Sequence, residues 1–307
     1  MPRPDLASLE LLVAVADRGG IGAAARSLGV SQPSASARLR ALERQLGLAL
    51  VRRTTHGSIL TGEGAAVVGW ARVTLGAVQE LVDGAAALRG ERRRRLRVGA
   101  SLTVAEHLVP VWVGTLTARE PDVSVTLEVG NSIAVARSVR SGTVQLGFVE
   151  GSRAPAGLRS RAIRKDELLL VVAPTHPWAQ RGVTPTELAG TPLVMREQGS
   201  GTREVLVRWL AGLGLAPTVA MELASTTAVV HAVGAGVAPA VVSRLVVARD
   251  IAEHRLVRVP IRTPAGEAVT LARNIRAVWA GPDVPSGAAG SFLRVAAARP
   301  SEPAAGR

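Results

Sequence analysis

The stretch that most constrains the fold of this chain is residues 21–40, IGAAARSLGVSQPSASARLR. Apolar side chains recur there at intervals of three, one and three, which is the spacing along the inward face of a short helix. They are Ile21, Ala24, Ala25 and Leu28. Gly29 ends this helix, and Ser31 followed by Pro33 is typical of the first turn of a second one. Because the alanines let two helices approach closely across a tight turn, the stretch indicates a helix-turn-helix.

The second helix of this pair has a polar face opposite its leucines. The residues expected on that face are Gln32, Ser34, Ser36, Arg38 and Arg40. Amides, hydroxyls and guanidinium groups can reach base edges and phosphates in the major groove of DNA. The same residues also suit an ordinary helical hairpin with a solvated surface, and this stretch alone does not distinguish the two interpretations.

The composition narrows the class of partner. A chain of 307 residues that is 47% apolar can form two or three domains with sizeable cores. The formal charge of +13 favours a polyanionic partner, although an arginine excess with Lys165 as the only lysine can also reflect genome base composition. With two Phe and no Tyr, the chain has few rings for stacking on single strands, so duplex DNA is the better candidate.

Several classes of site and location are disfavoured. Cysteine is absent, which excludes disulfides and thiolate metal sites. The five histidines form no HExxH or HxH pair, and QGSGT around Ser200 lacks the GxSxG elbow of hydrolases. We see no secretion signal, and no apolar run reaches the ~18 residues that a membrane span needs. We therefore expect a cytoplasmic protein that is not an enzyme and holds no metal or cofactor.

The N-terminal part should contain further elements around the helix pair. A helix with apolar residues from Leu6 to Ala16 precedes it, and residues 48–64, LALVRRTTHGSILTGEG, mix β-forming residues with arginines as a two-stranded wing would. Residues 63–89 lack proline and repeat apolar residues at helical spacing, which predicts a long helix. The arginine run at 92–95 then marks a joint. Such a run is usually a solvated hinge, although contact with DNA is the other interpretation.

Beyond Arg95, segments typical of strands and helices alternate, which implies an α/β fold with mostly parallel pairing. Polar residues follow four of these strands, each where a helix begins. They are Ser101 and Thr103, Asn131 and Ser132, the segment 199–202 (GSGT), and residues 225–227. Their hydroxyls and free backbone amides would converge at the carboxyl side of the sheet, where a small anion could bind. Each residue considered alone could also be a simple helix cap.

Taken together, residues 9–64 closely resemble the N-terminal domain of LysR-type transcriptional regulators. The shared pattern is an alanine pair, a Leu-x-Val-Ser-Gln-Pro turn, a Leu-Glu-x-x-Leu-Gly helix end, an arginine in the wing and a closing Leu-Thr-x-x-Gly. In this chain these are Ala24 and Ala25, Leu28 to Pro33, Leu42 to Gly47, Arg53, and Leu60 to Gly64. The resemblance continues to about residue 297 through GNSIAVARSVRSGTVQLGFVEG and REQGSGTRE. Two departures are Val51, where an aromatic is usual, and Ala37, where arginine is frequent, so the base preference does not carry over.

The resemblance implies a multidomain fold. It comprises a winged helix-turn-helix domain at 1–62, a linker and dimerisation helix at 63–90, and a two-lobed α/β effector domain of periplasmic-binding-protein type at 91–307. Lobe I would comprise about 91–164 with 268–297, and lobe II about 165–267. The implied partners are double-stranded promoter DNA, a small-molecule effector, further copies of the chain as a dimer and then a tetramer, and RNA polymerase, whose recruitment depends on the effector.

The resemblance also assigns roles to individual residues. Base-edge contact is carried over to Gln32, Pro33 and Ser36, and phosphate contact to Ser31, Arg38, Arg52 and Arg53, with Ser34 as a further DNA-binding candidate. The effector cleft is carried over to Ser101, Thr103, Ser132, Ser200, Gly201, Thr202 and Thr226. Glycines and hydroxyls in GSGTRE suit a carboxylate, phosphate or sulfate, so the effector is expected to be anionic. Arg203 could join this site or pair with Glu197 or Glu204 on the surface.

Two rival functions belong to other classes. The C-terminal domain alone would suit a solute-binding protein that serves a transporter, and the same α/β lobes could carry an enzyme. The leading 62 residues and the absence of catalytic motifs favour the regulator. Duplex binding that is lost when residues 1–62 are deleted would separate it from both rivals.

Overall fold

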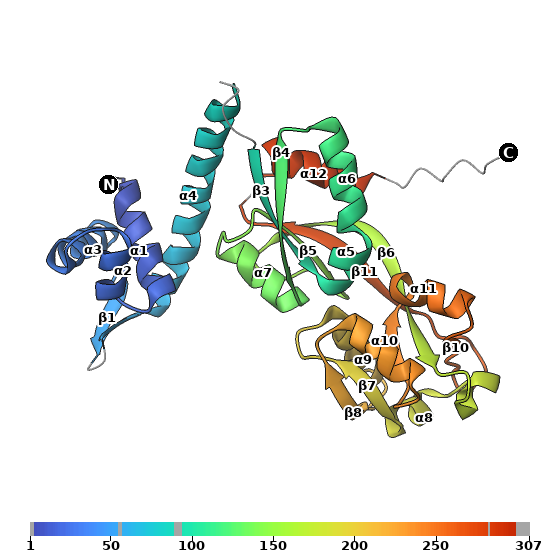
Figure 1. Cartoon of the computed structure of the whole chain (residues 1–307). Helices are drawn as coiled ribbons and strands as arrows, with labels where there is room; N and C mark the ends of the chain where they lie inside the picture. Colours follow the sequence, from blue (N-terminus) through green and yellow to red (C-terminus); the bar gives the residue numbers. More distant parts are fainter. Residues whose placement is uncertain (1–2, 55–56, 89–93, 282, 299–307) are drawn as a thin grey trace. The chain divides into compact units, whose positions relative to one another are not determined.

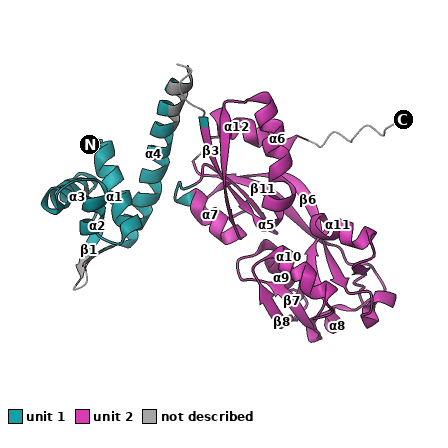
Figure 2. Cartoon of the chain, viewed as in Figure 1, with its two compact units in different colours: residues 1–94, 140–143 teal, residues 95–139, 144–307 magenta. Residues whose placement is uncertain are grey.

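The computed structural model describes residues 3–54, 57–88, 94–281 and 283–298. The chain forms two compact units (Figure 2), one comprising residues 1–94 with 140–143 and the other residues 95–139 with 144–307. The side chain of Arg53 and residues 92–93 of the arginine run lie outside the described part. Among the helices that are described, none is both long and apolar enough to cross a membrane.

The first unit contains four helices and a hairpin (Figure 1). The elements are α1 (Leu6–Arg18), α2 (Ile21–Ser27), α3 (Gln32–Leu46), β1 (Val51–Thr54), β2 (Gly57–Leu60) and α4 (Gly62–Leu88). Asp5 caps α1 by accepting a hydrogen bond from the Ser8 N–H at 2.8 Å. Gly19 and Gly47 end α1 and α3 in the left-handed conformation that glycine adopts without strain. These local signals set the element boundaries close to those that the sequence predicts.

The core of this unit lies where α1, α2 and α3 cross. Ala24 and Ala25 are buried there, and the leucine stripe of α3, including Leu39 and Leu42, packs against the same cluster. Small side chains at the crossing allow the two helices of the turn to approach closely. The β1–β2 hairpin is antiparallel, with Val51 opposite Leu60. This is the helix-turn-helix with a wing that the N-terminal sequence indicates.

The described part of the second unit contains four clusters of buried hydrophobic residues on a shared framework of strands, which we group into lobe I and lobe II. Lobe I is built from β3 (Arg94–Ser101), α5 (Leu102–His107), α6 (Val109–Arg119), β4 (Val123–Gly130), α7 (Ser132–Arg140), β5 (Leu146–Gly151) and α12 (Gly287–Ala297). Its core includes Trp112, Phe148 and Phe292, whose rings are 4.9 to 6.3 Å apart between centroids. Contacts between rings at these distances favour tilted and edge-on packing.

Lobe II is likewise built from strands and helices around buried hydrophobic residues. Its elements are a 3-10 turn η1 (Pro177–Gln180), α8 (Pro185–Gly190), β7 (Pro192–Arg196), α9 (Gly201–Ala211), β8 (Thr218–Leu223), α10 (Thr226–Gly234), β9 (Ala240–Ser243), α11 (Arg244–Ala252) and β10 (Val257–Val259). Strand β7 pairs with β8 in parallel. Leu193 and Met195 point into one core cluster and Val194 into another, so β7 is buried on both sides.

Two long strands connect the lobes, β6 (Arg159–Val172) and β11 (Leu271–Trp279). Leu271 packs in the core of lobe II, whereas Ile275 and Trp279 of the same strand pack in lobe I. The strands pair antiparallel, and the register shifts between Ile275 and Arg276, which leaves Ile163 opposite no residue of β11. The stretch that joins the two lobe cores along this strand pair therefore comprises residues 164–167 of β6 and residues 271–275 of β11.

The topology differs from the sequence expectation in three respects. Pairing in the main sheet, β10-β6-β11-β5-β3-β4 with β9 beside β6, is mixed: β3 runs parallel to β5, whereas β6, β9, β10 and β11 form antiparallel pairs. The expectation of mostly parallel pairing was wrong, because the chain returns through both lobes. Between β3 and β4 the chain forms two helices, with Leu108 between them, where a simple strand-helix alternation has one. The elements β11, α11 and α12 were not expected.

Candidate functional site

The polar face of α3 is mostly exposed. Gln32, Pro33, Arg38 and Arg40 are exposed, and Ser36 is partly buried. The opposite side of the helix holds its buried residues at intervals of four and three: Ala35, Leu39 and Leu42. Because one stripe anchors the helix, the other is free to meet a partner.

The first turn of α3 arranges its own hydroxyls. Ser31 caps the helix, and its Oγ lies 3.3 Å from the Ser34 N–H and 2.8 Å from the Ser34 Oγ. A Cβ on Gly22 of α2 would lie 3.1 Å from the Oε1 of Gln32, so a larger side chain at that position would crowd the amide. The turn before α3 and the glycine of α2 together set where Gln32 can lie.

The wing is tied to α3 by a carboxylate that sequence reasoning missed. Glu43 Oε1 accepts hydrogen bonds from the backbone N–H of Leu50 at 2.8 Å and of Val51 at 3.1 Å. Arg52 is exposed on the strand that begins there. Glu43 belongs to the Leu-Glu-x-x-Leu-Gly pattern at Leu42 to Gly47. That pattern did not indicate that the glutamate side chain reaches the wing.

The centre of the second site is Arg273, a completely buried arginine on β11. Its Nη2 lies 2.7 Å from Glu150 Oε2, and its Nε lies 2.7 Å from Asp166 Oδ2. The guanidinium also donates from Nη1 to Thr202 Oγ1 at 2.8 Å and from Nη2 to Thr103 Oγ1 at 3.4 Å. One side chain thus contacts both lobes and the strand that connects them.

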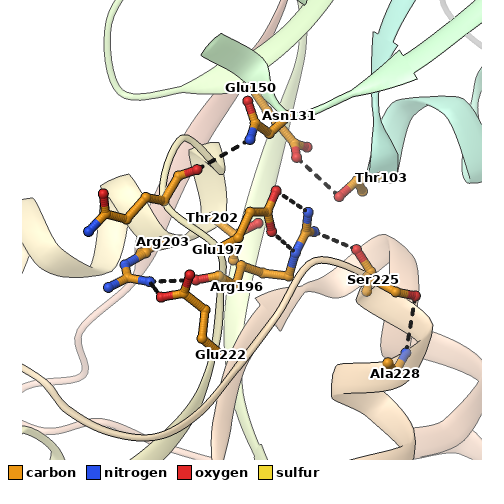
Figure 3. A network of polar contacts seen from close by, with 12 residues as sticks. Thr103, Asn131, Glu150, Arg196, Glu197, Thr202, Arg203, Glu222, Ser225 and Ala228 are labelled. Atoms are coloured by element: carbon orange, nitrogen blue, oxygen red, sulfur yellow. Dashed lines mark hydrogen bonds and ion pairs between the residues drawn. The ribbon is translucent and has the colours of Figure 1, made fainter. Parts of the chain in front are cut away.

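Most of the expected cleft residues contact other groups of the protein, as Figure 3 shows for Thr103 and Glu150. Thr103 Oγ1 donates to Glu150 Oε1 at 3.2 Å, and Ser132 Oγ donates to the Glu150 carbonyl at 2.9 Å. Thr226 Oγ1 accepts from Arg196 Nη1 at 2.6 Å. Sequence reasoning identified these hydroxyls but missed the charged groups that bind them, Glu150, Arg196 and Arg273. It also missed Asp166, which pairs with Arg273.

The two lobes touch at the start of α9. The Asn131 side-chain amide donates to the Gln198 carbonyl at 3.2 Å, and Ser152 Oγ donates to Glu204 Oε1 at 2.9 Å. A Cβ on Gly201 would lie 2.0 Å from the Glu150 carbonyl oxygen, a distance that no side chain tolerates. Gly201 is therefore required for close approach of the backbones, a role different from the ligand contact expected from the sequence.

Two buried hydroxyls at this junction have no partner among the described residues. Ser101 Oγ and Ser200 Oγ make no hydrogen bond there, although these residues are only 1% and 2% exposed. Each is the N-cap of a helix, α5 and α9, without the usual side-chain cap bond. Buried polar groups in proteins nearly always have a partner, so these two hydroxyls mark a place where another group can bind.

Burial dominates the electrostatics of Glu150. It raises the pKa of the Glu150 carboxyl, and the nearby charge of Asp166 raises it further. The charges of Arg273 and Arg196 and the hydrogen bond from Thr103 act in the opposite direction. The net direction is upward, so Glu150 holds its proton more readily than an exposed glutamate.

Arg203 lies outside this centre. It pairs with Glu222 and donates to the Arg196 carbonyl at 2.9 Å. Neither of the acidic partners considered from the sequence was right, because Glu197 pairs with Arg196 and Glu204 with Arg208. Within the described ranges, no cluster of three or more His, Asp or Glu side chains is arranged to hold a metal ion.

Comparison with known families gives two matches that together span most of the chain. The family model described as "Bacterial regulatory helix-turn-helix protein, lysR family" matches residues 6–65, and "LysR substrate binding domain" matches residues 89–300. An uncharacterized HTH-type transcriptional regulator of Mycobacterium tuberculosis is 42% identical over 296 residues, covering 92% of both chains. The regulator YeiE of Escherichia coli is 31% identical over 274 residues, covering 89% of both.

Solved structures show the same fold. ArgP from Mycobacterium tuberculosis superposes with a TM-score of 0.73 at 21% identity and covers 97% of this chain and 96% of its own. Full-length CbnR complexed with its target DNA gives a TM-score of 0.59 at 22% identity, covering 95% and 98%. The regulatory domain of Synechocystis CcmR in complex with 2-PG gives a TM-score of 0.58 at 23% identity, covering 66% and 95%.

Proposed function

Since this chain belongs to the family of LysR-type transcriptional regulators, which bind DNA and carry an effector-binding domain, we propose that α3 reads the promoter and that Arg273 centres the effector site. The observation that carries the first assignment is the exposed polar face of α3 on a buried leucine stripe. We place the proposed domain boundaries at residues 62 and 90 and the proposed lobe boundaries near residues 164 and 267.

The proposed DNA contacts divide by chemistry. Gln32, Pro33 and Ser36 face the bases, and the phosphates are bound by Ser31, Arg38, Arg52 and Arg53, with Ser34 beside them. An amide can pair with two atoms of adenine in the major groove, whereas guanidinium groups bind phosphates of any sequence. The complex of CbnR with its target DNA supports DNA binding by a chain of the same fold.

The proposed assembly begins at α4. Trp70 and Leu81 are 68% and 72% exposed, and together with Val73 and Ala77 they follow one another at intervals of three and four along one face. An exposed apolar stripe of this kind is typical of a surface that another helix covers. We assign it to a second copy, with a tetramer as the complete assembly and RNA polymerase as a further partner at the promoter. We also propose that the protein works in the cytoplasm.

The proposed effector is a small anion bound between the lobes. Support comes from the buried guanidinium of Arg273, from the free hydroxyls of Ser101 and Ser200, and from the start of helix α9. Thr103, Ser132, Gly201, Thr202 and Thr226 complete the surroundings. The CcmR complex with 2-PG supports a ligand in the corresponding domain of a relative.

The test is recovery of genomic fragments by the purified protein, with and without candidate small anions. We expect a defined set of duplexes to be enriched over scrambled competitor, and enrichment to disappear when residues 1–62 are deleted. Equal recovery of scrambled DNA would overturn the regulator. Undiminished function of the deleted protein in solute uptake would instead support the transport-type alternative.

A further inference from the structure

We infer that the cleft binds its anionic effector together with one proton, which Glu150 takes up. The inference rests on the proposed function, because it specifies how the proposed anion enters the proposed site. It follows from a count of the charges around Arg273, from the two unpartnered hydroxyls and from the hydrogen bonds that distinguish the two buried carboxylates.

The charge count at the centre is unfavourable for an anion. Glu150 and Asp166 both contact the single guanidinium of Arg273, so the buried triad carries a net charge of −1 when both acids are ionised. The other arginine that acts on Glu150, Arg196, has its Nε 2.8 Å from Glu197 Oε2. An added anion would therefore meet a negative centre with little solvent screening, which is costly in a buried site.

Glu150 is the carboxylate of this pair that can be neutralised by protonation. Both oxygens of Asp166 are satisfied as a carboxylate, by Arg273 Nε and by Ser243 Oγ at 2.9 Å. Among the described residues, the Glu150 carboxylate accepts one hydrogen bond, from Thr103, and shares the guanidinium of Arg273 with Asp166. Its surroundings raise its pKa, mainly by burial. The charged groups that act on it are Arg273 of β11, Asp166 of β6 and Arg196 of β7.

Protonation would convert the centre into an anion site. A neutral Glu150 no longer competes for Arg273 Nη2, and its own O–H becomes a donor. Ser101 and Ser200, whose hydroxyls have no partner among the described residues, belong to the segments that bring Thr103 and Gly201 against Glu150. A guanidinium, a carboxylic acid and two hydroxyls together can bind the oxygens of a carboxylate or sulfate.

Coupling between anion binding and protonation of Glu150 fixes the direction in which anion affinity changes with pH. The anion binds the protonated form, so affinity rises as pH falls, and above the pKa of Glu150 the Kd increases about tenfold per pH unit. The dependence ends below that pKa, where Glu150 is already neutral. An anion whose own charge is constant across the range isolates the contribution of the protein.

The experiment uses the full-length protein and a fixed set of anions that stay ionised, namely sulfate, acetate and oxalate, between about pH 6 and about pH 8. Thermal shift identifies a binder, and calorimetry in two buffers of different ionisation enthalpy gives the protons taken up. We expect uptake approaching one proton per anion at the higher pH. No binding by any of the three, or binding without proton uptake, would overturn the inference.

Glu150→Gln provides the matched test, because it makes the centre neutral at every pH. We expect it to bind the same anion at high pH with at least tenfold lower Kd than the unmodified protein, and with no pH dependence. Glu167→Gln removes one charge from the neighbouring position of β6, where Glu167 pairs with Arg258, and should keep the pH dependence. The proton measurement on the unmodified protein decides the question even if Glu150→Gln is unstable. Loss of duplex binding with proton uptake intact would count against the proposed function instead.

Discussion

The polar face of α3 and the polar centre around Arg273 use similar side chains in opposite ways. On α3, hydroxyls and arginines are exposed, and the hydrogen bonds of the first turn join residues three positions apart. Around Arg273, the groups are buried, and the bonds join residues 71 to 170 positions apart. The first surface is exposed to a partner. Among the described residues, the polar groups of the second are mostly satisfied internally, apart from the hydroxyls of Ser101 and Ser200 and from Glu150 Oε2, which is ion-paired with Arg273 but not hydrogen-bonded.

The difference shows what each site requires of the fold. An exposed arginine stays hydrated without a partner, so α3 needs only a helix with the right face outward. A buried arginine must be paired, because an isolated charge in the interior is very costly. The polar centre around Arg273 is therefore structural as well as the proposed effector site, and variants there should affect stability and anion binding together, whereas variants on the α3 face should affect DNA binding alone.

The largest effect is expected for Arg273→Met. It leaves Glu150 and Asp166 buried without their cation, which should lower the free energy of unfolding by about 3–5 kcal/mol. Urea denaturation followed by tryptophan fluorescence measures this, since Trp112 and Trp279 lie in the core of lobe I. The matched control is Arg258→Met, which removes an exposed partner of Glu167 and should cost less than about 1 kcal/mol. Equal losses in the two variants would contradict the comparison.

The contrast also explains how much could be predicted from the sequence. Helix spacing, caps and turn glycines act within a few residues, so the helix pair, the wing and α4 were predicted close to their observed bounds. The candidate hydroxyls around the polar centre could be selected from the sequence because each follows a strand at a helix start. Their charged partners could not be, because nothing local in RKDEL or LARNIR links Asp166 to Arg273. The antiparallel return of β11 was missed for the same reason.

A second prediction concerns Glu43, a carboxylate that ties the wing to α3. Glu43→Ala leaves the backbone N–H groups of Leu50 and Val51 without their acceptor, which should cost about 1–3 kcal/mol of stability. It should weaken DNA binding and leave anion binding unchanged. Glu10→Ala removes the same charge from an exposed position on α1 and should change stability by less than about 0.5 kcal/mol. An unaffected duplex affinity in Glu43→Ala would show that the wing does not depend on this tie.

A third prediction separates base reading from phosphate binding on α3. Gln32→Ala should reduce discrimination between target and scrambled duplex by about 1–3 kcal/mol. Arg38→Ala should weaken binding to both duplexes and lower the salt slope by about one unit. Titrations at several salt concentrations measure both quantities. Neither variant should change the midpoint of urea unfolding; a clear shift would mean that the α3 face is structural, like the cleft.

The smallest effect is expected at the cap of α1. Asp5→Ala should cost about 1 kcal/mol, whereas Asp5→Asn keeps an acceptor and should cost less. The hydrogen bonds from Ser8 lower the pKa of Asp5 below its usual value of 3.8. The stabilisation is therefore complete above about pH 4 and is lost as pH falls through the lower pKa of the folded state. Thermal unfolding measured from neutral to acid pH should show the midpoints of the unmodified protein and of Asp5→Ala converge as the pH falls. A difference between these midpoints that stays constant would exclude the ionised cap.

The unmatched residue Ile163 has a consequence for how the lobes can move. An extra residue in one strand of an antiparallel pair bends that strand and increases its twist. Directly beyond it, Asp166 and Arg273 face each other in register, and a slip of one position would turn Arg273 to the opposite side of the ribbon. We therefore expect opening between the lobes to proceed by torsion of β6 and β11 about the paired residues Asp166 and Arg273, which keeps the guanidinium on the side of the proposed effector site.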